Sequence, residues 1–91
     1  MKVLVLYRPN SEYGRVAEEF IHEFQARDDT KYLEILDIDS REGSATATLY
    51  DVVRHPAILV LQTDGMLQKS WIYDDNGGFP RVDEVVSYVR V

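Results

Sequence analysis

The sequence predicts an α/β fold of seven segments in the order β-α-β-α-β-β-α, with a mixed four-stranded sheet flanked by three helices in a single domain of residues 1–91. Three observations predict this class. Residues 3–7 and 57–61 are continuously apolar and rich in Val, Leu and Ile, which is typical of central strands covered on both faces. Three other segments repeat apolar residues at helical spacing. A Thr-Asp-Gly turn at 63–65 indicates a β-hairpin.

The first strand, residues 3–7, is expected to end at Pro9, and a helix follows it. Ser11 is a candidate N-cap for this helix, and Glu12 suits the positive end of the helix dipole. Apolar residues then recur every fourth position, which predicts an amphipathic helix with one buried face: Val16, Phe20 and Phe24.

A second strand is predicted at 32–38, followed by a helix that Asp39 or Ser40 caps and that Pro56 stops. The apolar stripe of this helix is predicted to be Ala45, Leu49, Val52 and Val53.

The third strand, 57–61, is expected to lie centrally, and the alternating segment 66–73 to form a strand nearer an edge. Pro80 suits the first turn of a last helix. That helix has the i, i+3, i+4, i+7 spacing of a face packed on the sheet: Val82, Val85, Val86 and Val89. Trp71 and Tyr73 either pack under this helix or form an exposed partner surface.

The chain has 16 acidic and 10 basic residues, a formal net charge of −6, and no cysteine. Its acidity repels phosphate backbones and its basic residues are scattered singly, so we expect no nucleic-acid binding. The absence of cysteine excludes disulfides and thiolate chemistry. The two histidines, His22 and His55, lie far apart, and the acidic pairs lack the spacing of a calcium loop, so neither a metal site nor a cofactor is predicted. We expect His22 on the surface.

The first ten residues contain an apolar run of only about five residues, shorter than the roughly 7–15 of a signal peptide. No other stretch approaches the length of a membrane span. We therefore expect a cytoplasmic protein that does not enter a membrane. The oligomeric state does not follow from the sequence.

Three stretches carry a resemblance to a known family. Residues 3–14 read VLVLYRPNSEYG, residues 33–40 read LEILDIDS, and residues 50–67 read YDVVRHPAILVLQTDGML. Together they resemble the thioredoxin-like superfamily in its compact, glutaredoxin-like form. The first matches a strand, a basic residue, a proline and the cysteine loop. The second matches the second strand and its Asp-rich turn, and the third matches the segment through the proline to the hairpin.

The resemblance implies that the His55–Pro56 peptide bond is cis. It places Ser11 where the family has its nucleophilic cysteine and Gly14 where it has the resolving one. Thiol–disulfide exchange requires a thiolate, so the oxidoreductase activity of the family is not carried over.

In glutaredoxins a basic residue before the loop, the backbone beside the cis-proline and a Gly-Gly turn hold glutathione. Comparable places in this chain hold Arg8, His55 with Pro56, and Gly77 with Gly78, and the loop contributes Ser11, Tyr13 and Gly14. The resemblance thus implies a candidate groove at these positions. Where the family has Thr-Val or a similar pair before the proline, this chain has Arg54-His55.

Three functions remain open on these residues. The leading hypothesis is a redox-inactive protein that binds a protein or peptide partner. The second is a site for a glutathione-like small molecule, with or without transferase chemistry at Ser11. The third and weakest is a hydrolase in which His55 activates the hydroxyl of Ser11 as a nucleophile. The alternative role of Ser11 is that of a helix cap.

Overall fold

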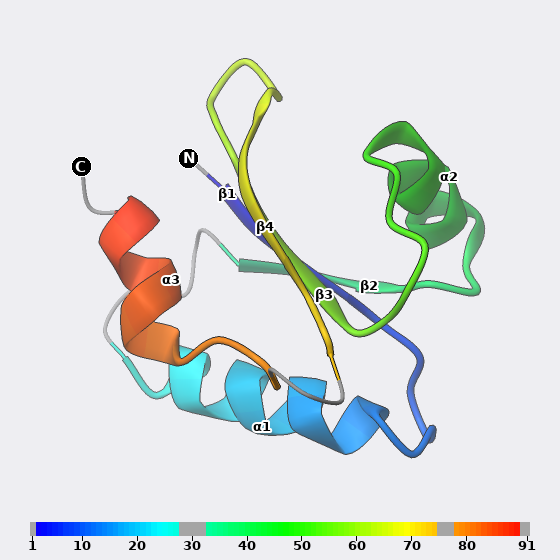
Figure 1. Ribbon diagram of the computed structural model, residues 1–91, viewed down its shortest axis with the longest axis horizontal. Helices are drawn as coiled ribbons and strands as arrows, with labels where there is room; N and C mark the ends of the chain where they lie inside the picture. The colour runs from blue at the N-terminus through cyan, green and yellow to red at the C-terminus, as the bar shows by residue number, and fades with distance from the viewer. Residues whose placement is uncertain (1, 28–32, 75–77, 90–91) are drawn as a thin grey trace.

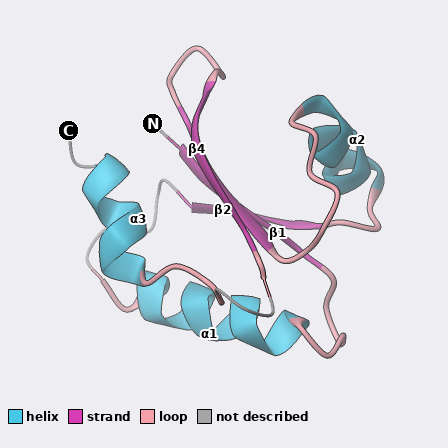
Figure 2. Cartoon of the chain, viewed as in Figure 1, coloured by secondary structure: helices cyan, strands magenta, loops and turns pink. Residues whose placement is uncertain are grey.

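The computed structural model of the chain describes residues 2–27, 33–74 and 78–89. Its elements follow the predicted order: β1 (Lys2–Tyr7), α1 (Gly14–Gln25), β2 (Leu33–Asp37), α2 (Arg41–Leu49), β3 (Ala57–Leu61), β4 (Leu67–Ile72) and α3 (Val82–Val89). The sheet has the strand order β2-β1-β3-β4, with β1 parallel to β2 and the other pairs antiparallel. Helices α1 and α3 cover one face and α2 covers the other (Figures 1 and 2).

The two central strands are buried on both faces, which explains their continuous apolar sequences. Along β1, Val3 and Val5 belong to the core under α1 and α3, whereas Leu4 and Leu6 belong to the core on the α2 side. Every residue of β3 is buried. Burying one such side chain contributes roughly 1.5–3 kcal/mol, so these strands supply much of the driving force for folding.

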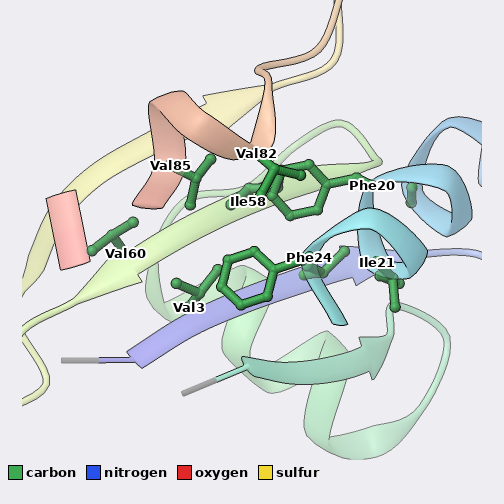
Figure 3. Close-up of a cluster of buried hydrophobic side chains, with 10 residues drawn as sticks. Val3, Phe20, Ile21, Phe24, Ile58, Val60, Val82 and Val85 are labelled. Atoms are coloured by element: carbon green, nitrogen blue, oxygen red, sulfur yellow. The ribbon is translucent and has the colours of Figure 1, made fainter. Parts of the chain in front are cut away.

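Helices α1 and α3 meet above β3 in the larger of the two cores. Figure 3 shows Phe20 of α1 and Val82 of α3 above Ile58 of β3. An ion pair between Arg27 and Asp83 joins the end of α1 to the start of α3 at the surface. The predicted buried faces of both helices are confirmed, except that Val16, Val86 and Val89 are only partly buried.

The predicted start of α1 is wrong. The helix begins at Gly14, its N-cap is Tyr13, and no side chain caps it. Ser11 Oγ instead donates a hydrogen bond of 2.6 Å to the carbonyl oxygen of Arg8, which closes the loop before the helix. Glu12 therefore lies ahead of the first helical turn rather than within it.

The predicted apolar stripe of α2 is wrong except at Val52, which is buried beyond the end of the helix. Ser40 is confirmed as the N-cap. The helix ends at Leu49, well before Pro56, and its buried residues are Gly43 and Ala47. Leu49 is 73% exposed and Val53 is 85% exposed. Helix α2 lies so close to the sheet that small residues face it, and larger apolar residues point outward.

The close approach of α2 occurs at its first turn. Ser40 Oγ accepts a hydrogen bond of 2.9 Å from Gly43 N and donates one of 2.7 Å to the carbonyl oxygen of Asp37, at the end of β2. A Cβ atom on Gly43 would lie 1.9 Å from that same oxygen. The φ of Gly43 lies outside the left-handed region, so its backbone conformation does not require glycine. The lack of space for a Cβ atom does.

The hairpin and the last strand follow the prediction. Gly65 turns the chain with a φ of 88°, and β4 forms one edge of the sheet. Trp71 packs under α3, with its ring centroid 5.3 Å from that of Tyr88 and its Nε1 donating to Glu84 at 3.3 Å. This supports packing rather than an exposed patch at Trp71. Pro80 precedes α3 by two residues instead of lying in its first turn.

We expect Gly43→Ala to lower the free energy of unfolding by about 1–3 kcal/mol, because the added methyl group forces α2 away from Asp37. Urea unfolding followed by circular dichroism measures the change. The control is Ser44→Ala, an exposed neighbour on the same helix, which should stay within about 0.5 kcal/mol of the original chain. Equal stability of the Gly43→Ala and unaltered proteins would contradict this account.

Candidate functional site

A hollow of about 120 Å³ lies where the loop before α1 meets the ends of β3 and β4. Its lining residues are Tyr13, Arg54, His55 and Tyr73. Tyr13 is the N-cap residue of α1, Arg54 and His55 lead into β3, and Tyr73 follows β4. Segments far apart in the sequence thus form one small site.

Aromatic rings form one wall of the hollow and anchor it to the core. The ring centroids of Tyr13 and Tyr73 lie 5.0 Å apart, and those of Tyr73 and Phe79 lie 6.4 Å apart. Phe79 in turn meets the buried ring of Phe20 edge to face at 5.8 Å. Because Phe20 belongs to the main core, this chain of rings holds Tyr73 in place.

The segment beside Pro56 forms the floor. The His55–Pro56 peptide bond is cis, and Tyr73 N donates a hydrogen bond of 2.9 Å to the carbonyl oxygen of Pro56. The Nδ1 atom of His55 is buried and, among the described residues, has no hydrogen-bond partner. Leaving such an atom unsatisfied costs about 1–3 kcal/mol, so this nitrogen stands out in the site.

Arg54, rather than Arg8, is the basic residue of the hollow. Arg8 Nε and Nη2 bind the two carboxylate oxygens of Asp39 at 2.8 and 3.1 Å. The hydrogen bond to Asp39, with the charge of that carboxylate, raises the pKa of Arg8. Arg54 is exposed and forms no ion pair within the described part of the chain. The predicted role of Arg8 in ligand binding stays a prediction, and the residue would have to leave Asp39 to fulfil it.

Ser11 lies in the loop without the arrangement of a nucleophile. Its hydroxyl donates to the carbonyl oxygen of Arg8, so its hydrogen is not directed to an imidazole. His55 lines the hollow, but Ser11 does not. The hydrolase hypothesis needs a serine–histidine hydrogen bond, and the observed bonding of Ser11 does not favour it.

Gly14 is buried at the start of α1 and leaves no room for a side chain. A Cβ atom there would lie 2.6 Å from the carbonyl oxygen of Arg8 and 3.0 Å from Ser11 Oγ. The loop thus closes over the position at which the resemblance places the resolving cysteine. Beside it, Tyr7 ends β1; burial, with smaller contributions from the charges of Glu18 and Asp37, raises the pKa of Tyr7.

The remaining predicted positions divide into two groups. Gly77 lies outside the described residues, as do Asp28, Asp29 and Asp75 of the acidic pairs. Gly78 is exposed with a φ of 74° and forms an isolated antiparallel bridge with Asp74, in which its N–H donates to the carbonyl oxygen of Asp74 at 2.6 Å. Glycine adopts this positive φ without strain.

Over 2–27, 33–74 and 78–89, no three His, Asp or Glu side chains gather in a way that could hold a metal ion. His22 is exposed on α1, as predicted. In this part of the chain, every helix is too short or too polar to cross a bilayer.

Sequence reasoning found Tyr13 and His55 but missed Arg54 and Tyr73 as members of one site. The sequence did contain a feature that pointed to Arg54. The Arg54-His55 pair places two basic side chains before the proline, where the glutaredoxin pattern has Thr-Val or a similar pair. No comparable sequence feature pointed to Tyr73 as a member of the site. Only the pairing of β3 with β4 brings it opposite Pro56.

Comparison with solved structures agrees with this architecture. The structure is similar to that of the C-terminal domain of DsbD from Neisseria meningitidis in its oxidised form, with a TM-score of 0.64 and 17% sequence identity, covering 97% of this chain and 76% of that one. No family model matches the chain, and no curated protein matches it in sequence. At this identity the likeness establishes the fold alone. The protein has a thioredoxin-like fold, and its chain contains no cysteine.

We expect Gly14→Ala to destabilise the protein by about 1–2 kcal/mol, since the clash with Arg8 outweighs the gain of roughly 1 kcal/mol in helix propensity. Urea unfolding provides the measurement. Glu12→Ala, an exposed position in the same loop, is the control and should change stability by less than about 0.5 kcal/mol. A Gly14→Ala protein more stable than the original chain would show that the loop relaxes freely.

Proposed function

We propose that this protein is a redox-inactive binding module that holds an extended peptide segment of a partner protein beside Pro56. The observation that carries the proposal is the hollow formed by Tyr13, Arg54, His55 and Tyr73 in a chain without any thiol. The described residues of the site offer a shaped surface and polar side chains, and Ser11 is not placed among them as a nucleophile.

The backbone next to the hollow supports a peptide ligand. The pairing of β1 with β3 ends at Leu6 and Ala57, so β1 does not extend over His55. Within the described residues, the amide and the carbonyl of His55 take part in no backbone hydrogen bond. Backbone groups at the open end of a ladder can pair with an extended peptide, and a neighbouring pocket then selects a side chain.

Glutathione is the smaller ligand of the same chemical kind, since it is itself a peptide with free carboxylates. The basic Arg54 beside the hollow favours it as the second candidate. The ion pair of Arg8 with Asp39 weighs against it, because the resemblance assigns Arg8 to the tripeptide.

The purified protein is expected to show no catalysis of insulin reduction above the background of dithiothreitol alone. The reason is that exchange proceeds through a thiolate and the chain contains none. Turbidity of the released insulin chains gives the readout, with an active thioredoxin as the positive control. Sustained turnover by the pure protein would overturn the redox-inactive assignment.

An array of immobilised hexapeptides tests the binding function directly. We expect a subset of peptides to bind, and the strongest, labelled and measured by fluorescence polarisation, to bind about tenfold more weakly to an Arg54→Ala/His55→Ala variant. Tenfold corresponds to about 1.4 kcal/mol, a typical loss for one or two polar contacts. The matched control is His22→Ala/Arg41→Ala, which removes the same two residue types from exposed helix positions.

Chemical-shift mapping locates the site in the same experiment. The bound peptide should perturb amides in 8–14, 55–57 and 78–79, and millimolar glutathione should perturb them only if the second candidate is correct. Failure of every peptide on the array to bind, or perturbation confined to α2, would refute the proposed function.

A further inference from the structure

The size of the hollow limits what enters it to one side chain. Its volume of about 120 Å³ is somewhat below the roughly 150 Å³ of an engineered cavity that accommodates benzene. A single residue of a peptide fits this space, whereas a whole tripeptide does not. The question is therefore which side chain the lining residues select.

The polar groups around the hollow are suited to a negative charge. Arg54 provides a guanidinium that, within the described residues, has no carboxylate partner, in contrast to Arg8, which is bound to Asp39. A planar guanidinium binds a carboxylate through two parallel hydrogen bonds. Among the described residues that line the hollow, none is Asp or Glu.

His55 adds a second donor of the appropriate kind. Its Nδ1 is buried without a partner among the described residues, and burying a polar atom without a hydrogen bond is unfavourable. Because His55 also lines the hollow, its imidazole lies next to the place that a ligand oxygen would occupy. A neutral imidazole donates from one nitrogen, and a carboxylate only accepts, so the two groups are complementary.

The aromatic wall of the hollow is suited to the methylene groups of a carboxylate side chain. The paired rings of Tyr13 and Tyr73 present an apolar surface against which methylene groups pack. A phosphate or sulfate has no such apolar part. The side chains of Glu and Asp combine a short methylene stem with a planar anionic end.

The charge of the whole protein restricts the ligand further. At a net charge of −6, the protein repels a strongly acidic peptide. The exposed residues of α1, the helix that begins directly after Tyr13, include Glu18, Glu19 and Glu23 as well as Arg15. A peptide with a single acidic residue in an otherwise neutral or basic segment would place one negative charge beside Arg54 and avoid repulsion by the acidic surface of the protein.

We propose that the hollow formed by Tyr13, Arg54, His55 and Tyr73 is an acidic-residue pocket, which takes one Glu or Asp side chain of the bound peptide and sets its sequence preference. This assignment rests on the proposed peptide-binding function. It specifies the residue that a partner must present opposite His55.

Two small probes test the pocket without a partner: N-acetyl-glutamate N-methylamide and its glutamine counterpart, which differs only in charge. Titrated into ¹⁵N-labelled protein, the glutamate probe should shift the amides of Tyr13, Arg54, His55 and Tyr73 and bind at least about fivefold more tightly than the glutamine probe. Arg54→Gln should abolish that difference, whereas Arg41→Gln, a change at an exposed α2 position, should preserve it. Circular dichroism verifies that both variants are folded.

Equal binding of the two probes, no shift with either, or shifts elsewhere with the glutamate probe would overturn the assignment. The hexapeptide array separates this failure from that of the proposed function. If peptides bind but Glu→Gln partners bind equally well, the pocket assignment falls and the peptide-binding function stands. If no peptide binds while the glutamate probe is selected at the hollow, the pocket stands as a small-carboxylate site and the peptide-binding function falls.

Discussion

The double burial of the central strands β1 and β3 is the constraint on which the remaining structure depends. Each strand supplies apolar side chains to both faces of the sheet, so each face needs a cover. Helices α1 and α3 cover one face, and α2 with the segment after it covers the other. Because β1 and β3 are antiparallel, the loop that follows β1 and the segment that precedes β3 lie at the same end of the sheet, where the candidate site lies.

Two glycines show how closely helices α1 and α2 pack against the neighbouring backbone. At Gly43 and at Gly14, the first turn of a helix lies against a backbone carbonyl, that of Asp37 and that of Arg8 respectively. In each case a serine three residues earlier, Ser40 or Ser11, also hydrogen-bonds to that carbonyl oxygen. The loop before α1 is therefore a tightly packed turn, and its structure does not depend on the chemistry for which related loops are used.

The same packing determines what the candidate site can do. Ser11 and Arg8 are engaged in local contacts, with a carbonyl oxygen and with Asp39, and are not available in the described arrangement. The groups that face the hollow come from the other side of the site, the segment before β3 and the end of β4. The proposed binding role makes use of these groups and requires no nucleophile at Ser11.

Prediction from sequence succeeded where a local pattern is sufficient and failed where packing distance decides. The strands 3–7 and 57–61 and the Ser40 cap were predicted because apolar runs and capping residues act locally. The stripe of α2 was misassigned because Leu49 and Val53 are apolar but exposed, while small residues face the sheet at close range. Helical periodicity shows which apolar residues share one face of a helix, but not how closely that helix approaches its neighbour.

The sequence by itself determined the order of elements and the absence of thiol chemistry, because apolar periodicity, turn residues and cysteine content are properties of the chain. Its resemblance to a known family indicated the thioredoxin-like fold. Tertiary structure decided that Arg8 binds Asp39 and that Arg54 joins Tyr13, His55 and Tyr73 around one hollow. These residues are up to 60 positions apart in the sequence (Tyr13 to Tyr73). Their association depends on strand pairing and on the chain of aromatic contacts through Phe79, and neither is encoded in any short stretch of sequence.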